Sequence, residues 1–157
     1  MCLTAKSVHG TGWQDERFYQ YDRWFENETM QEANVKYYYD QVTGEFDKVL
    51  AEHGYVRDGH YYRVEKANND TLVFFCHFGL GCVLISHLLS MSPMVLWHNL
   101  CAAPSSVTTL TSEERRKGIA GFRMNSYGDI SHLYAHDEPP AFAARFCECY
   151  DNDERHD

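Results

Sequence analysis

The sequence lacks the features that would place the protein in a membrane or on a nucleic acid. No apolar run reaches the about 18–20 residues that span a bilayer, and the first residues, MCLTAKSV, have no apolar secretion-signal core. Only 14 Lys and Arg stand against 23 Asp and Glu, which gives a formal net charge of −9. Phosphate backbones require clustered basic side chains. We therefore expect a cytoplasmic protein with neither membrane nor nucleic acid as a partner.

Paired C-x-x-C spacing is also missing. The sequence has six cysteines, and without a secretion signal we expect them to be reduced thiols. Only Cys147 and Cys149 are close together, so a metal module that uses them with His136 and His156 stays open as an alternative. Closed zinc sites normally need two closely spaced ligand pairs. The sequence therefore predicts no metal and no other cofactor.

What the sequence does contain indicates one globular domain. Apolar residues make up 44% and aromatic residues 15% of the 157 positions, enough for a buried core. We expect a single domain over residues 1–157. It begins with an aromatic-rich, irregular segment over 1–28, where we expect short helical turns at most. It ends in an acidic, loosely attached tail over 136–157.

The firmest local pattern is a helix that starts at a capping box. Thr29 and Glu32 have the spacing with which a hydroxyl and a carboxylate cap each other's backbone N–H groups. Apolar residues then recur at helical spacing as far as Gly54, a natural stop. The pattern predicts one helix of about 24 residues. A second, shorter helix is predicted to open at Ser92-Pro93 and run to about Leu100.

Two hairpins and a polar loop complete the local predictions. Turn residues Asp58-Gly59 separate two short strand-like runs, and β-branched residues predict a second, longer hairpin. The expected ranges are strands at 55–57 and 60–65, strands at 106–112 and 119–124 around a charged turn at 113–118, and a polar loop at 125–133.

The central stretch of the chain runs from Leu72 to Met91. Leu72–Phe75 is an unbroken run of strand-forming residues, typical of a strand that is buried on both faces. A turn at Cys76-His77-Phe78-Gly79 follows, and an apolar helix is predicted from Leu80 onward. Helix N-termini bind anions through unpaired N–H groups. A single histidine is often only structural, as we expect for His87, but this context makes His77 a candidate functional residue.

The motifs TLVFFCHFGLGCVLISHLL, MSPMVLWHNL, PSSVTTL and GDISHL, in this order, resemble the C-terminal half of the histidine phosphatase superfamily, the phosphoglycerate mutase-like proteins. The resemblance covers about residues 29–134. The family's buried strand ends in a Ser-His-Gly turn, where this chain has Cys76-His77-Phe78. The resemblance implies a three-layer α/β/α fold with a mixed, mostly parallel sheet.

The same resemblance implies a phosphoryl-transfer enzyme acting on a small phosphorylated metabolite through a phosphohistidine. His77 matches the family's second histidine, which donates to the phosphate oxygens. The backbone N–H groups of Phe78 and Gly79 are then expected to bind phosphate as well. A preorganised donor of this kind is typically worth about 10²–10³ in rate. Phosphatase and mutase activity are not distinguished.

The nucleophile motif of the family, Arg-His-Gly, has no match in this chain. The only candidate is Val8-His9-Gly10-Thr11, with Val in place of Arg, and Arg17 and Arg23 do not have the motif's spacing. We therefore expect an N-terminally truncated domain that is inactive alone. The alternative is an inactive remnant that keeps a phosphate-binding corner or acts through protein contacts. Without its neighbouring strand, Leu72–Phe75 would expose unpaired backbone groups, so we also expect a homodimer or swapped assembly that covers this edge.

Overall fold

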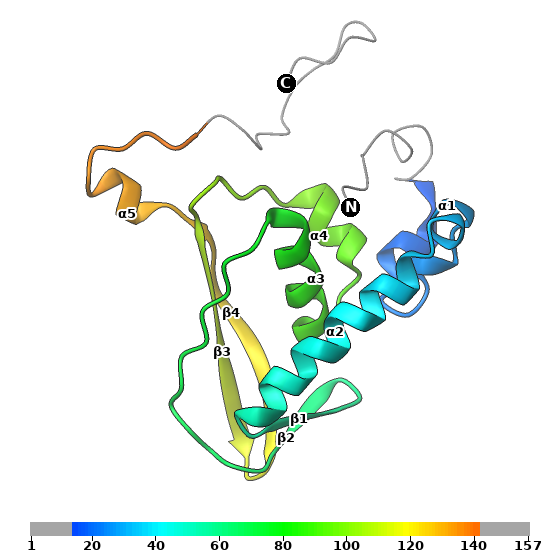
Figure 1. Ribbon diagram of the computed structural model, residues 1–157, viewed down its shortest axis with the longest axis horizontal. Helices are drawn as coiled ribbons and strands as arrows, with labels where there is room; N and C mark the ends of the chain where they lie inside the picture. The colour runs from blue at the N-terminus through cyan, green and yellow to red at the C-terminus, as the bar shows by residue number, and fades with distance from the viewer. Residues whose placement is uncertain (1–13, 142–157) are drawn as a thin grey trace, which may run out of the picture.

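The computed structural model describes residues 14–141, and Figure 1 shows their arrangement. Helices and strands alternate irregularly along the chain, and two short 3₁₀-helices come first. In chain order the elements are η3 (Glu16–Tyr19), η4 (Trp24–Glu26), α1 (Glu28–Glu32), α2 (Val35–Glu52), β1 (Tyr55–Asp58), β2 (Tyr61–Val64), α3 (Phe78–Leu89), α4 (Pro93–Asn99), β3 (Val107–Arg116), β4 (Ile119–Asp129) and α5 (Ser131–Tyr134).

The sheet corrects the expected fold, because its four strands are all antiparallel rather than mostly parallel. Their order is β1-β2-β4-β3, and each neighbouring pair runs antiparallel. Tight turns at Gly59 (φ 61°) and Gly118 (φ 82°) join β1 to β2 and β3 to β4. A tight hairpin turn can only join antiparallel strands, whereas parallel strands need a long crossover. The local hairpins therefore decide the sheet's direction.

The strand predicted over Leu72–Phe75 does not belong to this sheet, so the prediction of a strand buried on both faces is wrong. Residues 67–77 form neither helix nor strand, and in Figure 1 they run as a long uncoiled segment between β2 and α3. Val73 is 68% exposed and Phe75 is 97% exposed. The reason is that a strand needs a hydrogen-bonded neighbour, and no strand in residues 14–141 pairs with this segment.

The described residues form two layers instead of the expected three, with α2 and α3 on one face of the sheet (Figure 1). The side chains of β4 alternate accordingly. Ala120, Phe122 and Met124 face the helices, while Gly121 and Arg123 are exposed on the other face. Within residues 14–141 this outer face of the sheet is open to solvent.

The long predicted helix is interrupted at Asn34. This residue adopts a left-handed conformation (φ 51°) that separates α1 from α2. The cap of α1 is Asn27, whose side chain accepts a hydrogen bond from the N–H of Thr29, so the capping box predicted at Thr29 is wrong. Asn tolerates the left-handed region better than most residues. The predicted stop at Gly54 (φ 87°) is confirmed.

Both hairpins and the short helix are confirmed, with shifted ends. The first turn is Gly59-His60, one residue later than predicted. Ser92 caps α4 and Pro93 begins it, as predicted. The polar loop predicted over 125–133 is wrong in part, because β4 continues to Asp129 by pairing with β3.

The aromatic N-terminal segment packs onto the helices. Its described part is irregular with two 3₁₀-turns, as predicted, and it buries Phe18 and Trp24. The ring of Trp24, which is 1% exposed, makes edge contacts with Tyr39 at 5.2 Å and with Trp97 at 6.3 Å between centroids. No helix in residues 14–141 has the length and apolar character needed to cross a membrane.

Candidate functional site: the start of helix α3

His77 occupies the cap position immediately before α3. Its backbone is extended (φ −84°, ψ 159°), its side chain is exposed, and the ring does not cap the helix. Within residues 14–141 the imidazole forms no hydrogen bond or ion pair. The ring is therefore available to a ligand from solvent.

The first turn of α3 is anchored from both sides. The indole Nε1 of Trp97 donates a hydrogen bond to the carbonyl oxygen of Gly79 at 3.1 Å, and the N–H of Gly81 donates to the carbonyl oxygen of His77 at 2.9 Å. Phe78 packs against the core cluster of α3 and α4. The first N–H groups of an α-helix have no acceptor within the helix. Those of α3 therefore lie next to the imidazole, an arrangement suited to an anion.

Arg17, Arg23 and Arg57, three arginines whose side chains could bind a phosphate, form their hydrogen bonds and ion pairs in other parts of the molecule. Arg57 binds the carbonyl oxygen of His87 at 2.7 Å, near the opposite end of α3. Since α3 has 12 residues, its two ends lie about 18 Å apart. Arg17 is held by Asp15, and Arg23 by Glu26.

Two other predicted groups lie wholly or largely outside the described residues. The candidate nucleophile segment Val8-His9-Gly10-Thr11 lies outside the described residues, as do Cys147, Cys149 and His156 of the alternative metal module. Within residues 14–141 no group of three or more His, Cys, Asp or Glu side chains could hold a metal ion.

A buried polar network, which the sequence did not reveal, lies between α2, α3 and the first hairpin. His87 is buried, as predicted, and its Nε2 lies 2.9 Å from both carboxylate oxygens of Asp47. Its Nδ1 is buried without a partner within residues 14–141. The hydroxyl of Tyr62 donates to Asp47 at 3.4 Å, and burial raises the pKa of Tyr62 to about 12. The Tyr62 hydroxyl therefore stays protonated at neutral pH, as a donor must.

Arg57 joins this network to the N-terminal segment. Its guanidinium donates to the hydroxyl of Tyr62 at 2.7 Å and to that of Tyr21 at 3.4 Å. It also donates to the side chain of Ser90 at 3.3 Å, just past the end of α3. No sequence signal could have paired these residues, because they lie up to 36 positions apart. The network fixes the end of α3 that is remote from His77.

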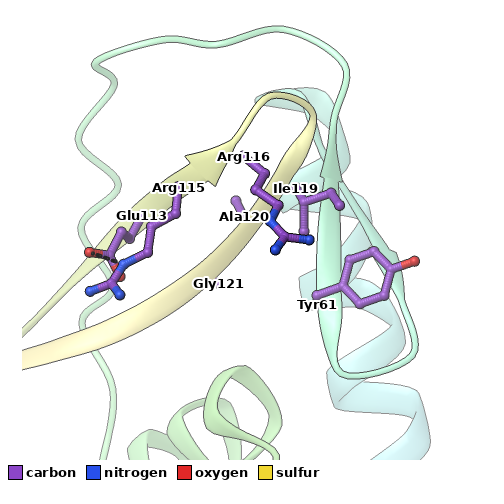
Figure 2. Close-up of a pocket in the computed structure, with 7 residues that line it drawn as sticks. All are labelled: Tyr61, Glu113, Arg115, Arg116, Ile119, Ala120 and Gly121. Atoms are coloured by element: carbon purple, nitrogen blue, oxygen red, sulfur yellow. Dashed lines mark ion pairs between the residues drawn. The ribbon is translucent and has the colours of Figure 1, made fainter.

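A shallow hollow of about 270 Å³ opens on the outer face at the closed end of the β3–β4 hairpin. Figure 2 shows the residues that line it: Tyr61, Glu113, Arg115, Arg116, Ile119, Ala120 and Gly121. Glu113 is bound by Arg115 and Arg123, which lower its pKa. The hairpin turn lies at the far end of the molecule from the start of α3 (Figure 1), so the hollow and His77 do not form one site.

Comparisons of the chain with protein-family models, with curated proteins and with solved structures gave no match.

Proposed function

We propose that His77 and the first turn of α3 form the phosphate-binding corner of a phosphoryl-transfer site of the histidine phosphatase type. The ligand is a small phosphorylated metabolite. The observation that carries the proposal is the exposed imidazole, which has no hydrogen-bond partner within residues 14–141 and lies directly before the N-terminus of a 12-residue helix. The order of the sequence motifs that resemble the family supports the same conclusion.

In this proposal His77 and the first turn of α3 bind the phosphoryl group and do not form the covalent intermediate. The imidazole and the N–H groups at positions 78 and 79 donate hydrogen bonds to the non-bridging oxygens of the phosphoryl group. Negative charge on these oxygens is stabilised by the imidazole N–H, by the amides and by the positive end of the helix dipole. The hydrogen bond from Trp97 to Gly79 keeps the amides of the first turn in place. The attacking nucleophile is not assigned to any described residue.

A second candidate function is anion binding without catalysis. It is favoured by the absence of any arginine side chain bonded at His77 within residues 14–141. A corner with one imidazole and a few amides binds phosphate weakly. The two candidates share the same binding residues and differ in turnover.

The first experiment titrates inorganic phosphate into the full chain and follows backbone amide signals by NMR. We expect the signals of residues 77–80 to shift. His77→Ala should weaken binding about tenfold or more, since hydrogen bonds to charged groups contribute about 1.5–3 kcal/mol. His132→Ala, which removes another exposed histidine, is the matched control. Shifts elsewhere, or equal effects of the two variants, would refute the proposal.

The second experiment separates the two candidates. A chromogenic phosphate ester is supplied to the full chain, and phosphohistidine is sought by mass spectrometry. Turnover that falls about 10²–10³-fold in His77→Ala supports the enzyme. Phosphate binding without turnover or phosphohistidine supports the non-catalytic corner in this chain.

A further inference from the structure

Residues 71–76 form an extended stretch, here called the apolar segment, whose backbone is unpaired. Within residues 14–141 none of its N–H or C=O groups forms a hydrogen bond. An unpaired backbone N–H or C=O group raises the free energy of the folded state unless water or another polar group forms a hydrogen bond with it. A row of them along an extended chain is the template to which another strand adds.

The side chains of the apolar segment alternate between two faces. Leu72 packs on the core cluster around Phe46, and the ring of Phe74 lies 5.4 Å from that of Phe46 between centroids. Val73 and Phe75, in contrast, point to solvent and are 68% and 97% exposed. This period of two is that of a β-strand with one covered face. The segment therefore has the side-chain pattern of a β-strand but no hydrogen-bonded neighbouring strand within residues 14–141.

The composition of the apolar segment indicates which kind of chain would pair with it. It reads Thr-Leu-Val-Phe-Phe-Cys, with no charge between Asp70 and His77. An occupant that satisfies both the backbone and the exposed Val and Phe must itself be extended, uncharged and apolar. A second copy of the same segment meets each of these conditions, and antiparallel pairing about a two-fold axis makes the contact self-complementary.

We propose that two copies of the chain associate through antiparallel pairing of their apolar segments, with Phe74 on the two-fold axis. Residues opposite each other in an antiparallel pair point to the same face of the sheet. Helix-facing residues must therefore meet helix-facing residues, because a slip by one residue would reverse every side chain. Centring the pair at position 74 places Val73 opposite the partner's Phe75, so that the two most exposed large apolar side chains of the apolar segment meet. An aromatic side chain opposite a β-branched one is a favourable cross-strand pair.

The exposed area fits a weak dimer. Phe75 and Phe74, at 97% and 45% exposed, offer together about 300 Å² per copy if a full Phe side chain counts as ~200 Å². With Val73 and the strand backbone, the two copies together reach the lower limit of about 1,000 Å² for a specific interface. Association should therefore depend on concentration. This inference is independent of the proposed function.

Sedimentation equilibrium of the full chain over a range of concentrations tests the proposal. We expect reversible dimerisation, and we expect Phe75→Lys to raise the dissociation constant by about 100-fold or more, because a dimer of the variant loses two large apolar side chains from its interface. Phe75 is almost fully exposed, so this change should leave the monomer's circular dichroism unchanged. Tyr134→Lys, at a residue that is 63% exposed on α5, is the control and should have no effect. A monomer at every concentration, or a dimer equally stable in Phe75→Lys, overturns the proposal.

Disulfide trapping tests the register. In the proposed pairing position 73 lies opposite position 75, within reach of a disulfide, whereas like positions lie on the diagonal at about 7–8 Å, where bridging is disfavoured. The double variant Val73→Cys/Phe75→Cys should give covalent dimer on mild oxidation, above the background of the native cysteines. Each single variant should stay at that background. Cross-linking of a single variant as efficient as that of the double variant overturns the register.

Discussion

Arg57 should be among the most sensitive single positions for stability, because its side chain connects β2, the N-terminal segment and the end of α3. Its guanidinium reaches the hydroxyls of Tyr62 and Tyr21, the carbonyl oxygen of His87 and the hydroxyl of Ser90. The perturbation is Arg57→Met, which keeps an unbranched apolar stem and removes all the donors. Arg57→Lys keeps the charge but cannot reproduce the planar fork.

The magnitude follows from the two short bonds. Those to Tyr62 and His87 are both 2.7 Å, whereas the other two are 3.3–3.4 Å and count for little. Each hydrogen bond from a charged donor contributes about 1.5–3 kcal/mol. Arg57 is only half-buried, so water replaces part of the loss. We expect Arg57→Met to lower the free energy of unfolding by about 2–4 kcal/mol, and Arg57→Lys by about half of that.

The assay is urea unfolding at pH 7, followed by circular dichroism for the wild type and both variants. The slope m should be unchanged, because the same surface is exposed on unfolding. Arg63→Met is a suitable control, since Arg63 is exposed on the neighbouring strand and its ion pairs at 3.8 Å are long. It should cost less than about 0.5 kcal/mol. If Arg57→Met costs no more than this control, the network does not stabilise the fold as argued.

Two further predictions concern titratable groups. Hydrogen bonds from Arg17 and then Asn27 hold the pKa of Asp15 well below its usual range. In the unfolded chain this pKa is about 3.9. The ionised carboxylate therefore stabilises the folded state fully above that pH, and the stabilisation is lost as the pH falls toward the folded pKa. Asp15→Asn should therefore flatten the decline in melting temperature between pH 4 and pH 2 relative to the wild type, and an unchanged pH profile would contradict this. Burial raises the pKa of the Cys82 thiol to about 12, so iodoacetamide at pH 8 should label the exposed Cys101 in the folded protein and leave Cys82 unmodified until urea is added, as peptide mass mapping can check.

The elements that could be predicted from sequence are those whose cause is local. Ser92 and Pro93 start α4 because one side chain caps the helix and the proline ring has no N–H to lose. Gly54 ends α2 because it accepts a positive φ. The same holds for the two hairpins, each formed around a glycine turn. Nothing distant in the chain is needed for any of these.

Predictions that depended on distant partners were wrong or incomplete. The parallel sheet followed from the family resemblance, whereas the described strands are joined by tight turns that permit only antiparallel pairing. The break at Asn34 is local, and it was not predicted because the apolar spacing continues through it. The burial of His87 was predicted correctly, but its partner Asp47 lies 40 positions away and has no sequence signal of its own.

The apolar segment shows why composition does not determine a strand. Its Val and Phe side chains favour a pleated, half-buried surface, and the alternation of Leu72 and Phe74 against Val73 and Phe75 is present in the structure. A strand, however, is defined by hydrogen bonds to a neighbour, and the sequence of one element does not say which chain supplies that neighbour. The segment leads directly into His77, so pairing would also order the backbone that carries the imidazole. Phe75→Lys tests strand pairing and His77→Ala tests phosphate binding, although both residues lie on the same stretch of backbone.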